Sequence, residues 1–308
     1  MSNLLGMIGI DKQPLVSVVV TTKNEEKHIG NCLLSIQEQS YPNIETIVVD
    51  NASTDKTKQI TKDYTNLVFD KGPERSAQRN YGMIDIAQGK YVMFIDADMI
   101  LSPCLVDACV CKLEKENVAA LYISEIILGT SYWCKVRRFE RSFYDATVVD
   151  SARIYRRNIF CKVGGFDEDI DFGEEWDLDK EVKQHGAITL LNKKCDSICM
   201  EWKLAPFIEN LGISRSIEKN AIYHNESEFE VNTYITKKGK YAQGFDKYIT
   251  KWGKSDPEIK KQFGLWYRFF GVFIEHGKWE KMSRHPVLFF GMYWLRFMVG
   301  LKYLLCIK

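Results

Sequence analysis

The sequence lacks the two glycine-rich loops with which many α/β proteins hold phosphate groups. It contains no G-x-G-x-x-G and no Walker loop. The first absence argues against a dinucleotide-dependent dehydrogenase, and the second against a P-loop NTPase. Any phosphate handling would therefore rest on a metal ion rather than on a glycine cradle.

The charge is balanced, the cysteines form no C-x-x-C, and residues 1–10 do not have the pattern of a signal peptide. The 308 residues carry 42 Lys and Arg against 41 Asp and Glu, so the overall charge gives no indication of a nucleic-acid partner. The nine cysteines form no C-x-x-C, so a zinc site is unsupported and we expect reduced, mostly buried thiols in a cytosolic protein. Residues 1–10 have no basic leader or long apolar core, so we expect no signal peptide.

What the chain does contain is a repeated pattern of strand, polar turn and helix. Residues 15–22 form a continuous β-branched run, which is typical of a strand buried on both faces of a parallel sheet. The predicted elements are strands at 15–22, 44–49 and 67–69, and helices at 28–39, 56–64 and 76–87. Asn24 is the predicted N-cap of the first helix. This order predicts an α/β fold whose polar turns lie along one edge of one sheet.

The next predicted strand, residues 90–95, ends in two carboxylates. Asp96 and Asp98 are separated by one small residue, and side chains at i and i+2 of a strand point the same way. At the carboxyl end of a buried strand, two convergent anions repel each other unless a cation lies between them. Oxygen ligands suit Mg²⁺ or Mn²⁺. A pair of solvated turn aspartates is the alternative interpretation.

Four segments in this order resemble the motifs of family-2 glycosyltransferases, which have the GT-A fold. They are Val18–Glu26, Ile47–Asp55, Ala77–Gly82 and Phe94–Asp98. The likeness extends from about Pro14 to about Trp202, and more loosely to Trp252. It implies a Rossmann-like, mostly parallel sheet flanked by helices, and a nucleotide-diphosphate sugar, with a UDP-sugar favoured, as donor.

The resemblance also assigns roles to individual residues. The implied nucleotide-sugar contacts are Thr22, Asn24, Glu25, Asp50, Ser53, Arg75, Arg79 and Asp96. The implied ligands of a Mn²⁺ or Mg²⁺ ion are Asp96, Asp98 and His224, although a lone histidine is more often structural or solvated. Arg153 and Trp176 are implied on the acceptor side.

Three acids at 174–177 open a predicted helix. Acids in a first helical turn stabilise the helix dipole by up to ~1 kcal/mol, which is one explanation for them. The family's Glu-Asp motif supplies another, because its second acid is the general base that takes a proton from the acceptor hydroxyl. That position is Glu175, one methylene longer than the usual Asp, so Glu174 and Asp177 remain alternatives. A base opposite a leaving-group cation implies in-line displacement with inversion.

Two segments beyond this point are basic and aromatic. Residues 133–144 predict either a solvated basic helix or a place where an anionic acceptor or a membrane surface approaches; their cations are Lys135, Arg137, Arg138 and Arg141. Residues 263–273 and 287–307 predict two apolar helices. Arg296 and Lys302 interrupt the second run, which disfavours a membrane span. We expect an interfacial helix pair with snorkelling Arg and Lys, and the alternative is a helical subdomain packed on the core.

Together the resemblance and the tail predict a metal-dependent, inverting hexosyltransferase. We expect a GT-A domain over residues 1–205, with a donor half at about 14–100 and an acceptor half at about 101–205, and a helical, membrane-facing extension over 206–308. The expected acceptor is a hydroxyl of a polyprenyl- or dolichol-linked glycan or another cell-surface polysaccharide precursor. The expected location is the cytoplasm, at the inner face of the cell membrane. A sugar-nucleotide-binding scaffold without turnover and a nucleotidyltransferase are the alternatives.

Overall fold

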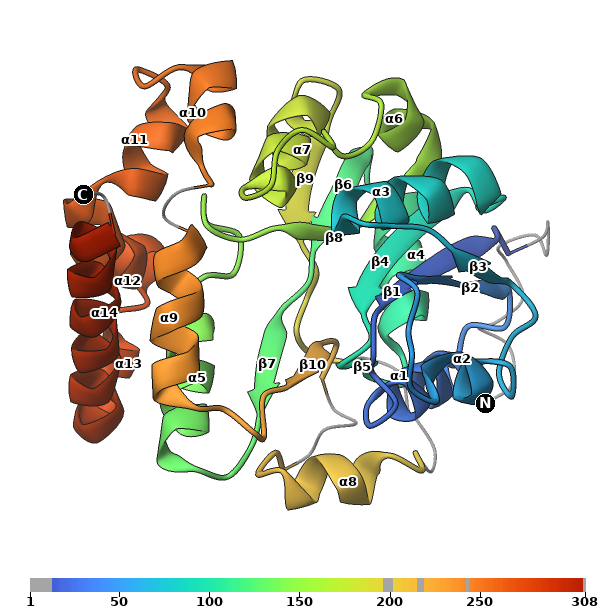
Figure 1. Ribbon diagram of the computed structural model, residues 1–308, viewed down its shortest axis with the longest axis horizontal. Helices are drawn as coiled ribbons and strands as arrows, with labels where there is room; N and C mark the ends of the chain where they lie inside the picture. Colours follow the sequence, from blue (N-terminus) through green and yellow to red (C-terminus); the bar gives the residue numbers. More distant parts are fainter. Residues whose placement is uncertain (1–12, 196–201, 215–218, 242–243, 307–308) are drawn as a thin grey trace, which may run out of the picture.

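The computed structural model describes residues 13–195, 202–214, 219–241 and 244–306. A seven-stranded sheet in the order β3-β2-β1-β4-β8-β6-β9 runs through its centre (Figure 1). Its strands are β1 (Val16–Thr22), β2 (Ile44–Asp50), β3 (Val68–Asp70), β4 (Tyr91–Asp96), β6 (Val118–Tyr122), β8 (Ala152–Arg156) and β9 (Ala187–Leu190). Strand β8 pairs antiparallel with β4 and β6, and the other pairings are parallel. The predicted mostly parallel α/β sheet is confirmed.

Helices cover both faces of this sheet, which is why every residue of β1 is buried. One face carries α1 (Ile29–Gln37), α2 (Thr57–Thr61) and α4 (Leu105–Lys115). The other carries α3 (Arg75–Asn80), which continues as a π-helix (Tyr81–Ile86), together with α6 (Arg157–Lys162) and α7 (Glu174–Lys183). Alternate residues of β1 serve the two layers: Val18 packs in the first and Val19 in the second.

A second sheet has three strands in the order β5-β10-β7. They are β5 (Met99–Leu101), β10 (Ile222–Asn225) and β7 (Glu125–Leu128). A break after Tyr122 separates β6 from β7, so the chain leaves the large sheet and enters the small one. The middle strand, β10, lies within the predicted extension, which therefore shares this sheet with the preceding part of the chain.

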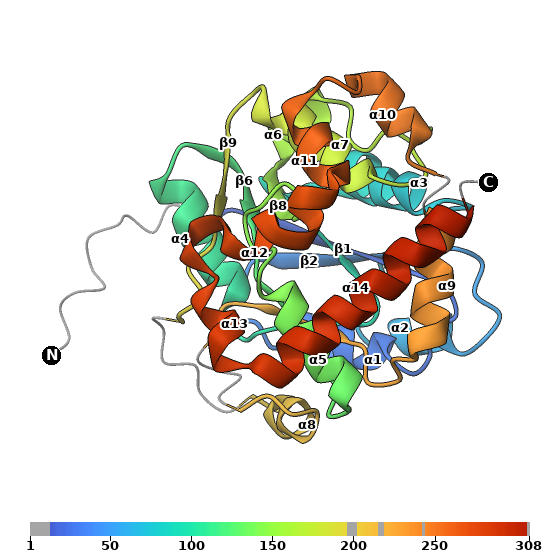
Figure 2. The same ribbon diagram turned by 90° about the vertical axis from the view of Figure 1, so that its left-hand side faces the viewer.

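The remaining elements are mostly helical and pack beside the two sheets. They are α5 (Tyr132–Arg141), α8 (Ala205–Asn210), α9 (Val231–Tyr241), α10 (Asp246–Trp252), α11 (Pro257–Phe263), a π-helical turn (Tyr267–Gly271), α12 (Val272–Ile274), a 3₁₀ turn (Glu275–Gly277), α13 (Glu280–Arg284) and α14 (Pro286–Cys306). Helix α14 lies along the outside of α5 and α9 (Figures 1 and 2). Within the described ranges, no helix is both long enough and apolar enough to span a bilayer.

Two local predictions are wrong. Asn24 is not the N-cap of α1, which begins at Ile29 after His28. The Asn24 backbone is left-handed, with φ 55°, and its side-chain oxygen accepts the Thr54 N–H at 2.8 Å. Asn24 therefore links the loop after β1 to the loop after β2 by a hydrogen bond. The residue pattern of either loop alone does not reveal this contact.

The arginines of α5 are neither solvated nor available to an anionic partner. Arg141 is buried and its Nη2 donates to Asp150 at 3.0 Å. Arg138 donates to the Ile127 carbonyl at 2.6 Å, and Arg137 pairs with Glu140. Lys135 is the exposed cation of this helix. Both sequence interpretations of the arginines fail because residues far along the chain also pair with them, such as Glu226 with Arg137 and the Leu211 carbonyl with Arg138.

The thiol prediction holds in part. Cys104 is disulfide-bonded, so the expectation of reduced thiols is wrong for this residue. Free cysteines of the described chain include Cys32, Cys109, Cys111, Cys134 and Cys161. Spacing along the chain cannot reveal a bridge between segments that only folding brings together. The sequence also predicts a strand at about 197–202, which falls almost wholly outside the described residues.

Candidate active site

The carboxyl ends of β1, β2 and β4 lie next to one another and gather the first predicted site residues. Thr22 pairs in register with Asp50, and Thr21 with Asp96. Because the three strands are parallel, these ends share one edge of the sheet, where open α/β sheets bind their ligands.

At the end of β2, the buried Asp50 carboxylate is held by Ser53. The Ser53 N–H donates to Oδ1 at 2.7 Å, and its hydroxyl donates to Oδ2 at 2.5 Å. On the neighbouring strand, the Thr22 hydroxyl is buried without a hydrogen-bond partner. Native proteins rarely leave such a group unpaired. It is therefore a candidate contact for a bound molecule.

Glu25, in the loop after β1, is part of an acidic group. Its N–H donates to the Thr57 hydroxyl at 2.8 Å, which fixes the loop. Burial, followed by the charges of Asp98 and Asp96, raises the pKa of Glu25 to about 7. A bound cation would relieve the part of this shift that comes from repulsion among the acids.

Arg79 lies completely buried between two acids from different elements. Its Nη2 donates to Asp96 Oδ1 at 3.2 Å, and its Nη1 donates to Glu175 Oε1 at 3.1 Å. The guanidinium lies over the Phe94 ring, 4.3 Å from the centroid. Burial alone would raise the pKa of Asp96, but Arg79 and then Arg153 outweigh burial and hold that pKa well below its usual range.

Asp98 has one paired oxygen and one unpaired oxygen. Its Oδ2 lies 3.1 Å from His224 Nε2, whereas its Oδ1 is buried without a hydrogen-bond partner. The other ring nitrogen of His224 lies 2.9 Å from Glu125 Oε1. Burial alone would lower the pKa of His224, but Asp98 and Glu125 raise it well above its usual range. The small sheet brings these three residues together, because β10 pairs with both β5 and β7.

The predicted ligands fit a divalent cation in their chemistry. Asp96, Asp98 and His224 offer oxygen and imidazole donors, a mixture that Mn²⁺ accepts. The unpaired Asp98 oxygen and the raised pKa of Glu25 point the same way. Among the described residues, however, no three acidic, histidine or cysteine side chains are already arranged as a metal site. Arg79 and His224 supply the positive charge there instead.

Two of the three acids at the start of α7 lie beside Arg79. Glu175 contacts Arg79 and lies 3.7 Å from Arg153 Nη1. Burial alone would raise the pKa of Glu175, but Arg153 and Arg79 lower it. Glu174 lies 3.4 Å from Arg75, and burial together with the charge of Glu175 raises its pKa.

Asp177 and Trp176 lie away from Arg79 and the acids that contact it. Asp177 is buried and accepts hydrogen bonds from the Trp252 indole at 2.7 Å and from Lys251 at 2.9 Å. Trp176 stacks on Phe245 with centroids 5.7 Å apart. Both side chains attach α10 and its surroundings to α7. We therefore drop Asp177 as a base and Trp176 as an acceptor contact.

Arg153 is a link between acids rather than an exposed acceptor contact. It is buried, and its Nη2 donates to Glu125 at 3.2 Å while Nη1 faces Glu175. Through Glu125 it connects to His224. Sequence reasoning missed Glu125, for which the one available signal was an acid within the apolar run 118–128.

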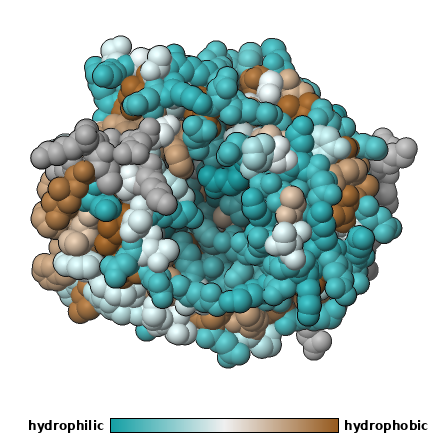
Figure 3. All heavy atoms as spheres, in the orientation of Figure 1, coloured by the Kyte–Doolittle hydropathy of each residue, from teal (hydrophilic) through white to brown (hydrophobic). Residues whose placement is uncertain are grey.

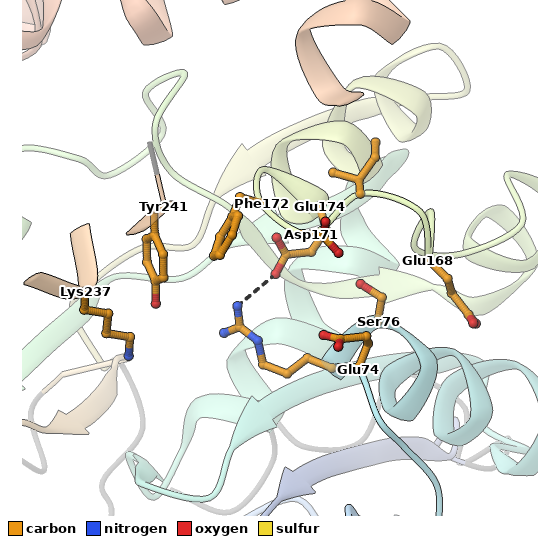
Figure 4. Close-up of a pocket in the computed structure, with 10 residues that line it drawn as sticks. Glu74, Ser76, Glu168, Asp171, Phe172, Glu174, Lys237 and Tyr241 are labelled. Atoms are coloured by element: carbon orange, nitrogen blue, oxygen red, sulfur yellow. Dashed lines mark ion pairs between the residues drawn. The ribbon is translucent and has the colours of Figure 1, made fainter. Parts of the chain in front are cut away.

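A pocket of about 550 Å³ opens beside Glu174 (Figure 4). Its lining is Glu74, Arg75, Ser76, Glu168, Ile170, Asp171, Phe172, Glu174, Lys237 and Tyr241. Phe172 and Tyr241 adjoin one another, with ring centroids 4.4 Å apart. In the orientation of Figure 1, the centre of the molecule is hollowed and hydrophilic (Figure 3). Aromatic rings beside carboxylates suit a sugar, which has both apolar faces and hydroxyl groups.

Sequence reasoning missed Phe172 and Lys237 as members of this pocket. Lys237 and Tyr241 are four residues apart on α9 and hence on one face of the helix, but nothing in the sequence shows that this face turns toward α7.

The fold belongs to the GT-A class of glycosyltransferases, and solved structures of that class are similar to it. A mannosyltransferase, PcManGT from Pyrobaculum calidifontis, solved with GDP-Man and Mn²⁺, is 18% identical, with a TM-score of 0.56 over 96% of this chain and 88% of that one. Residues 1–349 of S. aureus TarS, solved with UDP-GlcNAc, are 16% identical, with a TM-score of 0.50 over 94% of this chain and 89% of that one.

The sequence comparisons name the family. Residues 17–164 match the model of glycosyl transferase family 2. An uncharacterized glycosyltransferase of Haemophilus influenzae is 28% identical over 57% of this chain and 62% of its own length. The hyaluronan synthase of Pasteurella multocida is 22% identical over 78% of this chain and 25% of its own length. The chain thus spans less than two thirds of either relative. It contains a family-2 glycosyltransferase domain, as the ordered motifs predict.

Proposed function

We propose that the protein transfers a sugar from a nucleotide-diphosphate sugar to a hydroxyl group, with a divalent metal ion and with inversion. The position of Arg79 carries this proposal, because one buried guanidinium contacts Asp96 on the donor side and Glu175, the candidate base. The candidate base and an acid at the donor edge of the sheet are thereby linked through one cation.

The donor would lie across the ends of β1, β2 and β4. Its nucleoside would meet Thr22, Glu25 and Asp50, with Asn24 and Ser53 shaping the two loops. The unpaired hydroxyl of Thr22 supports this placement. A UDP-sugar is the favoured donor. The GDP-Man and UDP-GlcNAc complexes of the two structural relatives support a nucleotide sugar in general.

Asp96, Asp98 and His224 would hold Mn²⁺ or Mg²⁺. When bound, the ion would stabilise the negative charge of the departing diphosphate as a Lewis acid. Arg75 and Arg79 open α3 beside these acids and add positive charge on the same side.

Glu175 would accept the proton of the attacking hydroxyl. Its lowered pKa keeps the carboxylate ionised at neutral pH, as a general base requires. Arg79 and Arg153 approach the carboxylate and limit its orientations. Glu174 is the second candidate, since it lines the pocket and its raised pKa would make it the stronger base.

The acceptor sugar would occupy the pocket between Phe172, Tyr241 and Glu174. Its natural form would be a polyprenyl- or dolichol-linked glycan or another cell-surface glycan precursor, met at the inner face of the cell membrane. Lys237 and Tyr241 lie in the proposed extension, residues 206–308, which would therefore complete the acceptor site of the domain proposed at 1–205.

Donor hydrolysis and thermal shift across UDP-, GDP- and dTDP-sugars, with Mn²⁺, Mg²⁺ or a chelator, test the proposal. We expect one nucleotide class to stabilise the protein when metal is present. Glu175→Gln should keep that stabilisation and lose about 10²–10⁴-fold in transfer, whereas Glu174→Gln should lose much less. The reverse order would assign the base to Glu174. Nucleotide binding without turnover on any acceptor would favour a scaffold, and no response to any nucleotide would refute the proposed donor site.

A further inference from the structure

The outer face of α14 is a continuous apolar surface. Its large side chains are Val287 (68% exposed), Phe290 (69%), Trp294 (46%), Phe297 (62%), Leu301 (42%) and Leu305 (63%). They recur every three or four residues and so form one stripe, which we call the α14 outer face. The opposite side of the helix packs against α5 and α9. Monomeric soluble proteins rarely expose an apolar row of this length without a partner.

Arg296 is turned away from this face. It is only 8% exposed, its guanidinium pairs with Glu140 at 3.0 Å, and it donates to the Tyr144 hydroxyl. The prediction that Arg296 snorkels is therefore wrong. As a consequence, the α14 outer face carries no charged side chain from Val287 to Leu301.

Aromatic side chains widen the surface on both sides of the helix. On the α5 side, Trp294 lies 5.1 Å from Trp133, and the neighbouring Tyr132 is exposed. On the other side, the exposed Phe270 lies 6.4 Å from Tyr293. Helix α14 crosses the front of Figure 2, and hydrophobic residues gather at the left margin of Figure 3, where α14 lies.

The charge along α14 and the segment before it is net positive. Residues 280–308 contain five Lys and Arg and one acid, Glu280, which pairs with Arg284 at 3.1 Å. Lys281 and Arg284 precede the stripe and Lys302 lies near its end, so the excess charge at both ends is positive. A two-fold contact between copies would set cationic end against cationic end in either direction, which opposes self-association. Anionic lipid headgroups complement the same pattern.

We propose that α14 is an interfacial helix that lies flat on an anionic bilayer. The α14 outer face would enter the boundary between headgroups and acyl chains, with Arg284 and Lys302 among the headgroups; Lys281 instead donates to the Ser142 carbonyl at 3.0 Å. Aromatic side chains such as Trp294 suit this depth, since the ring is apolar and the N–H is polar.

This placement also sets the distance from the membrane to the pocket. Helix α9 packs against the protein side of α14, and its Lys237 and Tyr241 line the pocket. The pocket therefore lies about one helix diameter, ~10 Å, above the bilayer. On the basis of the proposed function, the acceptor is a glycan attached to a membrane lipid, whose sugar reaches the pocket past the edge of α9.

Vesicle co-sedimentation of the full chain tests the membrane contact. We expect binding to phosphatidylglycerol-containing vesicles, weaker binding at high salt, and little binding to phosphatidylcholine alone. Phe290→Ser combined with Phe297→Ser should lower the partition coefficient at least about tenfold. The matched control, Phe290→Leu combined with Phe297→Leu, should retain most of the binding because it keeps the surface apolar. All six residues are exposed, and thermal unfolding verifies that each variant folds.

Three results would overturn the membrane proposal. The first is equal vesicle binding by the serine and wild-type proteins, and the second is no binding by wild type. The third is a wild-type dimer in light scattering that the serine variant converts to a monomer without any vesicle binding, which would make the face a contact between copies. Donor hydrolysis in vesicle-free solution tests the proposed function separately, so a failure of either proposal can be told from a failure of the other.

Discussion

Replacing Arg79 with methionine should destabilise the protein far more than replacing Arg75, which lies one helical turn earlier. The Arg79 guanidinium lies 3.2 Å from Asp96, 3.1 Å from Glu175 and 3.7 Å from Glu174. Methionine keeps much of the side-chain length and apolar contact. It leaves three neighbouring carboxylates without the cation they share.

The expected loss in free energy of unfolding follows from the burial of Arg79 and the acids around it. At about 3 Å and an effective dielectric constant of about 20, each short contact carries a gross attraction of about 5 kcal/mol. Desolvation of the guanidinium cancels much of that gain. Removing only this cation, however, leaves the three acids with Arg153 and Arg75 alone to compensate them. Breaking a buried pair in this way costs about 3–5 kcal/mol. Partial exposure of Asp96 and Glu175 places the expected loss near the lower end, at about 3 kcal/mol.

Urea unfolding at neutral pH measures this loss as a free energy. Arg75→Met is the matched control, because its side chain is half exposed and makes one contact, 3.4 Å from Glu174. It should cost less than about 1 kcal/mol. Adding Glu175→Gln to Arg79→Met should restore about 1 kcal/mol, since it removes one of the uncompensated charges.

Equal losses for Arg79→Met and Arg75→Met would refute this reasoning. So would a double variant no more stable than Arg79→Met alone. Either result would mean that the guanidinium does not couple the donor-side acid to the candidate base, and the observation that carries the proposed function would fall with it.

Two further predictions concern other parts of the chain. Asp179 is buried, and burial raises its pKa to about 7 from 3.8 although it accepts hydrogen bonds from Ala152 N–H and the Tyr155 hydroxyl. Because the protonated form is favoured in the folded state, this group destabilises the fold as pH rises from about 4 to about 7. The loss of folding free energy caused by Asp179 should be about 2–3 kcal/mol larger at pH 8 than at pH 5. Asp179→Asn should remove this difference from urea unfolding curves. An unchanged difference would contradict the raised pKa of Asp179. Tyr241→Ala should raise the acceptor KM about tenfold with a smaller effect on the donor KM. Steady-state transfer assays measure both constants. A change in the donor KM alone would mean that the pocket binds the donor and not the acceptor.

The edge of the large sheet was predictable because it follows from short-range rules. Parallel order aligns the β1 and β2 ends with the end of β4 at Asp96. The alignment of Thr22 with Asp50 is an outcome of that order. Asp98 lies in the turn after β4, so the alternation of side chains along a strand does not place it.

The rest of the site depends on contacts that local pattern does not encode. His224 reaches Asp98 only because a second sheet forms, and the resemblance that pointed to His224 gave no sign of Glu125. The same limit explains Arg296. Helix α14 has large apolar residues on both its inner and outer sides, so periodicity could not show that its arginine turns inward to Glu140.

Cutting the chain after residue 205 should yield a fragment without a cooperative unfolding transition. The cut removes β10, the middle strand of the small sheet, and leaves the edges of β5 and β7 unpaired. It also uncovers the apolar side chains of α5 and α7 that pack against α10, α11 and α14. Circular dichroism during urea titration of the fragment and of the full chain tests this expectation. A sharp transition at the full-length midpoint would instead establish residues 1–205 as an independent folding unit. The extension would then be an attached layer that completes the acceptor pocket without supporting the fold.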